Sequence, residues 1–98
     1  MERKIKFSLE AKNNTKQIIS YLTREWSESI ADKFILNLEN KLKYINLFPY
    51  SFPPYEKFPD IRNCVLTKQI SLYYKINNKD IEVLALFDTR QHPDKLKF

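Results

Sequence analysis

The sequence contains no glycine in its 98 residues, and this absence removes two classes of nucleotide site. A phosphate-cradling P-loop and a dinucleotide fingerprint both need glycine, because it lets the backbone approach the phosphates closely. A serine hydrolase triad is also not expected, since the nucleophile elbow that presents its serine carries glycine. We therefore expect no nucleotide cofactor.

Cysteine and histidine are almost as scarce. Cys64 is the only cysteine, which excludes an internal disulfide and a cysteine-based metal site. It lies among apolar residues, and we interpret it as a buried thiol rather than a nucleophile. His92 is the only histidine, so a zinc site has little support. We expect neither a metal nor any other cofactor.

Long apolar runs are also missing. No run reaches the roughly 18 residues that a membrane-spanning helix needs. The first residues, MERKIKFSLE, are charged and are not followed by the apolar stretch of a secretory signal. With 43% hydrophobic and 14% aromatic residues, the chain is typical of a folded protein. We expect one cytoplasmic domain over residues 1–98, without a membrane association.

Positive charge is in excess, with 17 lysines and arginines against 12 acidic residues and a net charge of +5. Such an excess suits a polyanionic partner or an acidic protein partner. It suits a well-solvated surface on a small protein equally well, so charge alone leaves both interpretations open.

The C-terminal third predicts a hairpin of two strands joined by a polar turn at residues 77–80. In the first strand the apolar residues recur at every second position, which indicates one buried face: Ile70, Leu72, Tyr74 and Ile76. Residues 81–87 are apolar on both faces, with Ile81, Val83, Ala85 and Phe87 on one and Leu84 and Leu86 on the other. We expect this second strand to be central in its sheet.

The N-terminal half predicts a short strand at residues 4–7 and two amphipathic helices. Ser8 is a suitable cap for the first helix, and either Ser29 or Ser27 for the second. The first apolar stripe comprises Ala11, Thr15, Ile18, Ile19, Leu22 and Trp26. The second comprises Ile30, Ala31, Phe34, Ile35, Leu38, Leu42, Ile45 and Phe48. We expect an antiparallel helix hairpin, with Trp26 and Phe34 in the core.

A proline-rich segment at residues 49–60 should end the second helix and form a stiff, extended loop. Its aromatic residues would cover the core edge; recognition as a proline-rich ligand is the alternative. A further strand is expected at 61–67. The predicted fold is α+β: strand, helix, helix, then a three-strand meander, with the helix hairpin on one face of a small, mainly antiparallel sheet and the other face partly open.

Several basic residues follow or flank the predicted strands: Arg62, Lys68, Lys75, Arg90, His92 and Lys95. Antiparallel pairing can bring some of them to one end or face of the sheet. Together they could neutralise a phosphate, and a histidine can transfer protons near neutral pH. RNA cleavage by a 2′-hydroxyl needs a base, a cation for the phosphorane and an acid. A solvated basic rim in which Asp88 pairs with Arg90 is the alternative.

The chain resembles the RelE/ParE superfamily of bacterial toxins, closest to its ParE-like, plasmid stabilization branch. The element order carries the resemblance together with two segments, KFSLEAKNNTKQIISYLTREW and LYYKINNKDIEVLALFDTRQHPDKL, which include the motif Arg-x-x-Pro from Arg90 to Pro93. The resemblance covers nearly the whole chain. It implies the toxin of a type II toxin–antitoxin system, which arrests growth and is neutralised by a cognate antitoxin from the same operon.

Within this superfamily, RelE-like members cleave mRNA on the ribosome, and ParE-like members poison DNA gyrase. If the chain is an endoribonuclease, its catalytic candidates are Arg62, Arg90 and His92. Contacts with the target or the antitoxin would fall on Lys68, Tyr73, Lys75, Arg90 and Lys95. Acidic antitoxin segments would suit the basic charge and the open sheet face.

One departure weakens the nuclease interpretation. RelE-like nucleases typically carry a tyrosine near the C-terminus, whereas this sequence ends in Phe98 and has no tyrosine after Tyr74. Phenylalanine lacks a hydroxyl, and His92 would have to act as the acid. We therefore favour a ParE-like gyrase inhibitor over a RelE-like nuclease. A non-toxic relative that only binds antitoxin remains the third hypothesis, and a homodimer or a toxin–antitoxin hetero-oligomer are both open.

Overall fold

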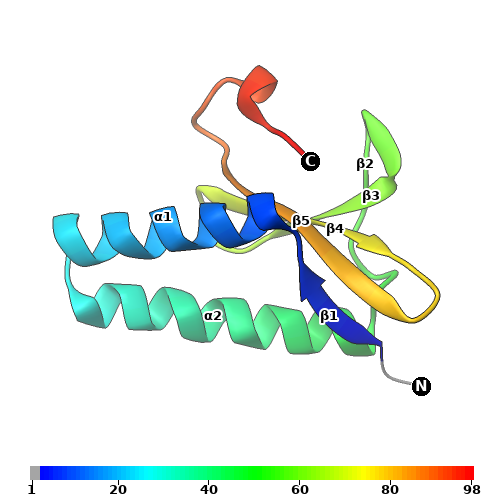
Figure 1. Ribbon diagram of the computed structural model, residues 1–98, viewed down its shortest axis with the longest axis horizontal. Coiled ribbons are helices and arrows are strands. Elements are labelled where there is room, and N and C mark those ends of the chain that lie inside the picture. Colours follow the sequence, from blue (N-terminus) through cyan, green and yellow to red (C-terminus); the bar gives the residue numbers. More distant parts are fainter. Residues whose placement is uncertain (1–2) are drawn as a thin grey trace.

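The computed structural model describes residues 3–98, and in it a helix hairpin packs against one face of a five-stranded sheet (Figure 1). The elements are β1 (Lys4–Phe7), α1 (Leu9–Glu25), α2 (Glu28–Leu47), β2 (Pro54–Tyr55), β3 (Phe58–Val65), β4 (Ile70–Ile76), β5 (Asp80–Asp88) and a 3-10 turn, η1 (Pro93–Lys95). The strand order is β1-β5-β4-β3-β2. Among the strands of residues 3–98, only the β1–β5 pair is parallel. The predicted α+β fold is confirmed.

The helix boundaries follow from side-chain caps. The Ser8 hydroxyl accepts a hydrogen bond from the Ala11 N–H at 3.0 Å, as expected for α1. For α2 the cap is Ser27, whose hydroxyl accepts from the Ile30 N–H at 3.2 Å, and Ser29 lies inside the helix. The second helix ends at Leu47, two residues before Pro49, as the proline predicts.

The main core lies between the helices and the sheet. It joins Ala11, Phe34, Leu38 and Ile45 of the helices to Cys64, Leu66, Leu72, Tyr74, Ile81, Val83 and Leu86. Phe34 and Cys64 are buried as predicted, but the prediction for Trp26 is wrong, because 69% of its surface is exposed. Trp26 caps the C-terminal end of α1, where both helices extend past the sheet (Figure 1). A helical stripe is buried only where a sheet lies beneath it.

A β-bulge in the β4–β5 ladder changes the predicted faces of β5. Tyr74 pairs with Val83 and Tyr73 with Ala85, so Leu84 is an additional residue. One additional residue inverts the alternation beyond it. Leu86 therefore joins Ile81 and Val83 in the main core, while Ala85 and Phe87 pack on the other face. The predicted grouping of Ala85 and Phe87 with Ile81 is wrong for this reason.

The second sheet face is more covered than expected. The segment after β5 returns across the sheet on the side away from α2 (Figure 1), where Leu96 packs on the cluster of Ile61, Tyr73 and Ala85. The ring centroid of Phe98 lies 5.5 Å from that of Tyr73. The proline-rich segment differs too, because it contains β2, and β3 runs over 58–65 rather than 61–67. None of the helices within residues 3–98 has the length and apolar character to cross a membrane.

Candidate partner-binding site

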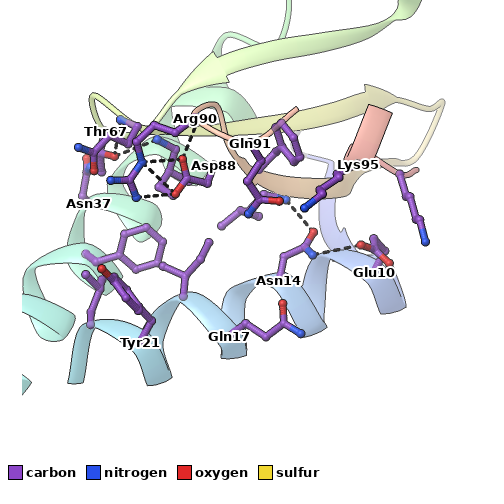
Figure 2. A pocket seen from close by; sticks show the side chains of 18 of the residues that line it. Glu10, Asn14, Gln17, Tyr21, Asn37, Thr67, Asp88, Arg90, Gln91 and Lys95 are labelled. Carbon is purple, nitrogen blue, oxygen red and sulfur yellow. Dashed lines mark hydrogen bonds and ion pairs between the residues drawn. The ribbon is translucent and has the colours of Figure 1, made fainter. Parts of the chain in front are cut away.

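An open cleft of about 1070 Å³ lies between the projecting helices and the end of the sheet (Figure 2). Its apolar lining consists of Ile18, Tyr21, Leu22, Ile30, Phe34, Ile70, Leu86 and Phe87. Its charged lining consists of Glu10, Lys33, Asp88, Arg90, Asp94, Lys95 and Lys97. An apolar floor with a charged rim is the usual composition of a protein-binding surface.

One wall of the cleft forms because the two neighbours of β5 differ in length. The four residues of β1 pair only with Asp80–Val83, and α1 lies along the rest of that edge. There the Asn14 Oδ1 accepts a hydrogen bond from the Leu86 N–H at 3.1 Å, and the Asn14 Nδ2 donates to Glu10 at 3.1 Å. Asn14 thus fixes one wall of the cleft to the sheet, and Figure 2 shows Asn14, Gln17 and Tyr21 along α1.

Arg90 enters the cleft from the loop that follows β5, and Asp88 holds it there. The Arg90 Nη2 donates to Asp88 Oδ2 at 2.6 Å and the Arg90 Nε to Asp88 Oδ1 at 3.0 Å. This pair lowers the pKa of Asp88 and raises that of Arg90, chiefly through the side-chain hydrogen bonds. Asp88, at the end of β5, therefore orients the Arg90 guanidinium. The two residues pair with each other, as in the predicted alternative to a phosphate site.

Arg62 lies elsewhere. It stands opposite Tyr74 of β4, whereas Asp88 stands opposite Ile70, so four residues, or about 13 Å, separate these positions along the strand. Its Nη1 donates to the Phe52 carbonyl at 2.7 Å, and its guanidinium lies 5.0 Å from the Tyr50 ring centroid. Arg62 therefore holds the loop after α2 and does not line the cleft.

His92 is exposed at the start of η1. Its Nδ1 accepts a hydrogen bond from the Asp94 N–H at 3.1 Å and lies 3.5 Å from the Asp94 carboxylate. Of the two other candidates for phosphate chemistry, Arg90 lies two residues before His92 in the chain, and Arg62 is hydrogen-bonded to the carbonyls of Tyr50 and Phe52. The structure thus brings Arg90 and Lys95 to the cleft and leaves Arg62 and His92 outside its lining.

The remaining predicted contacts are dispersed. Lys68 is exposed in the turn between β3 and β4, and Lys75 is exposed on β4. Tyr73 is only 5% exposed, beneath Phe98, and burial raises the pKa of its hydroxyl, with a smaller effect from Tyr55. Within the part of the chain that the structure describes, no three His, Cys, Asp or Glu side chains gather as metal ligands would.

The sequence interpretation missed the helical part of the cleft, above all Asn14, Tyr21 and Lys33. Asn14 offered a signal, since it lies three residues after Ala11 and four before Ile18, on the apolar stripe of α1. A polar side chain at such a position requires a buried partner, which here is the Leu86 N–H. Nothing comparable marks Lys33.

Comparison with known proteins identifies the family. The family described as ParE toxin of type II toxin-antitoxin system, parDE, matches residues 5–93. The chain belongs to the ParE toxin family. It is thus a toxin-family member of a type II toxin–antitoxin system within the RelE/ParE superfamily, as the sequence predicted.

Solved structures share its fold at low sequence identity. The chromosomal ParDE toxin–antitoxin system of P. aeruginosa has a TM-score of 0.75 at 15% identity, covering 89% of this chain and 96% of that one. The E. coli DinJ-YafQ toxin-antitoxin complex has a TM-score of 0.65 at 13% identity over 92% and 96%. The YoeB/ParE toxin from Agrobacterium tumefaciens has a TM-score of 0.65 at 10% identity over 87% and 96%. No curated protein sequence matches significantly.

Proposed function

We propose that this ParE-family chain arrests bacterial growth in the cytoplasm by inhibiting DNA gyrase, and that a cognate antitoxin neutralises it by occupying the cleft. The observation that carries the choice of gyrase over mRNA is the dispersal of the basic residues. Arg62 is hydrogen-bonded to the Phe52 carbonyl, and Arg90 is paired with Asp88. These two arginines do not converge on one phosphate.

Cleavage of RNA would need a base, an acid and a cation within reach of the same phosphodiester. His92 alone in this chain offers an imidazole, and its Nδ1 accepts the Asp94 N–H. Arg90, two residues before it in the chain, already has its charge offset by Asp88 through three side-chain hydrogen bonds. This arrangement favours a toxin that acts by binding.

The cleft supports the antitoxin part of the proposal. Three lysines of its lining, Lys33, Lys95 and Lys97, form no ion pair with any residue from 3 to 98. A segment with apolar residues for the floor and carboxylates for these lysines would fit. Two of the structures with this fold are described as a ParDE toxin–antitoxin system and a DinJ-YafQ toxin-antitoxin complex.

The test combines a supercoiling assay with purified DNA gyrase and the mapping of RNA 5′ ends in cells. The purified protein should inhibit DNA supercoiling by gyrase, and addition of the antitoxin encoded beside it should restore supercoiling. Induction of the protein alone should stop growth without producing new RNA 5′ ends phased to codons. Codon-phased ends would instead establish the ribosome-dependent endoribonuclease. Unaltered growth with soluble protein would indicate a non-toxic, antitoxin-binding relative.

A further inference from the structure

A second surface lies at the far end of α2. Four large side chains between positions 44 and 50 are exposed there: Tyr44 by 47%, Leu47 by 63%, Phe48 by 54% and Tyr50 by 64%. Single exposed apolar side chains are common, but a group of this size marks an interaction surface. We call these four residues the aromatic platform.

The backbone that carries the aromatic platform is fixed by side chains from the sheet. The buried Tyr74 donates its hydroxyl hydrogen to the Pro49 carbonyl at 2.6 Å. Arg62 donates to the carbonyls of Phe52 at 2.7 Å and Tyr50 at 3.4 Å. A surface held in one conformation loses little entropy on binding, which favours affinity.

The rings are also ordered against one another. The ring centroid of Tyr44 lies 5.2 Å from that of Phe48 and 5.7 Å from that of Phe52. The Phe52 centroid lies 6.4 Å from that of the core residue Tyr74. The Arg62 guanidinium covers the Tyr50 ring at 5.0 Å. Tyrosine and arginine dominate the residues that carry binding energy at protein interfaces.

The segment that carries the aromatic platform is basic, with its flanking acidic residues, Glu39 and Glu56, at its two ends. Residues 40–55 contain no aspartate or glutamate but include Lys41 and Lys43. Neither lysine nor Arg62 takes part in an ion pair within residues 3–98. A second copy of this chain would bring like charges together, which opposes self-association. The surface suits a partner whose apolar pocket is bordered by carboxylates.

Single-stranded nucleic acid fits this surface less well. Stacking of bases needs free ring faces. Arg62 covers one face of the Tyr50 ring, and the Tyr44 ring contacts those of both Phe48 and Phe52. Leu47, one of the most exposed members of the aromatic platform, cannot stack at all.

The aromatic platform is separate from the cleft. Lys33 and Asn37 of α2 line the cleft, and Leu47 follows ten residues after Asn37, or about 15 Å along the helix. From these observations we propose that the aromatic platform is the surface with which the chain docks on its protein target, the antitoxin being held at the cleft instead. This inference rests on the proposed function, in which that target is gyrase.

The experiment measures affinities for purified DNA gyrase and for the purified antitoxin with four proteins. These are the wild type, the double variant Phe48→Ser/Tyr50→Ser, the single variant Lys43→Glu, and the control Trp26→Ser. Trp26 is as exposed as the aromatic platform residues but lies at the opposite end of α2. Lys43→Glu changes only an exposed charge, so it tests the surface even if the double variant folds poorly.

The double variant should bind gyrase at least tenfold more weakly and Lys43→Glu severalfold more weakly, while both bind antitoxin within twofold of wild type. The control should match wild type in both measurements. If the wild type binds gyrase and neither Phe48→Ser/Tyr50→Ser nor Lys43→Glu weakens that binding, this inference is overturned and the proposed function stays intact. Variants that lose antitoxin binding but keep wild-type affinity for gyrase would also overturn it. If the wild type binds the antitoxin but does not bind gyrase, both gyrase as the target and the aromatic platform as its docking surface are overturned.

Discussion

Asn14 and Leu86, 72 positions apart in the sequence, are joined by a hydrogen bond from the Leu86 N–H to the Asn14 Oδ1 at 3.1 Å. This bond lets a helix side chain take the place of a strand, because β1 ends before it reaches that part of β5. The same bond positions α1 at the wall of the cleft. Asn14 therefore both pairs with the edge of β5 and fixes one wall of the cleft, beside the hydrogen bond from the Ser8 hydroxyl to the Leu84 carbonyl.

Asn14→Ala should destabilise the fold by about 1–2 kcal/mol, because it leaves the Leu86 N–H without its acceptor. Urea unfolding followed by circular dichroism measures this change. Asn13→Ala, at the exposed neighbouring position, is the matched control and should stay within about 0.5 kcal/mol of wild type. Equal stability of the two variants would show that the bond contributes nothing.

Asp88 should make part of the free energy of unfolding depend on pH in the acid range. Its pKa is lowered from the ordinary value of 3.8, mainly by hydrogen bonds from Arg90, so its contribution is fully present above that value. The contribution is lost as the pH falls below 3.8 and through the lowered pKa. The stability difference between wild type and Asp88→Asn should therefore shrink over this range in acid unfolding titrations. Asp60→Asn, at an exposed position without an ion pair in the described residues, should show no such change.

Charge reversal in the cleft should weaken antitoxin binding. Lys33→Glu combined with Lys95→Glu is expected to lower the affinity at least tenfold, mostly through a slower association rate, because opposite charges steer encounter. Surface plasmon resonance at two salt concentrations measures both the rate and its salt dependence. Lys12→Glu combined with Lys16→Glu, on exposed positions of α1 outside the cleft lining, controls for net charge. An equal loss in both double variants would remove the cleft from the interface.

His92→Gln should retain full growth arrest, because a toxin that acts by binding needs no proton transfer from this imidazole. Growth after induction, at expression levels matched by immunoblot, is the readout. Arg90→Ala is the comparison: it should also arrest growth when induced alone, but co-expressed antitoxin should rescue growth less well than for wild type, since Arg90 lines the cleft. Loss of toxicity in His92→Gln with unchanged folding would support the nuclease instead.

Much of the fold was readable from the sequence because it depends on near neighbours. Alternation at residues 70–76, the cap at Ser8 and the helix stop before Pro49 each involve residues within a few positions of one another. The resemblance to the ParE-like toxins likewise rests on the order of these local elements. Fold and family were therefore determined by the sequence itself.

The site was decided by tertiary structure. The bulge at Leu84 moves Ala85 and Phe87 to the other face, and it is visible only in the pairing of β5 with β4. The cleft exists because α1 and α2 extend beyond the sheet, so Trp26 is exposed and Lys33 faces the cleft. Arg62 and Arg90 are kept apart by strand register. Register and the relative lengths of helices and strands are set by packing between distant segments, which no local pattern in the sequence records.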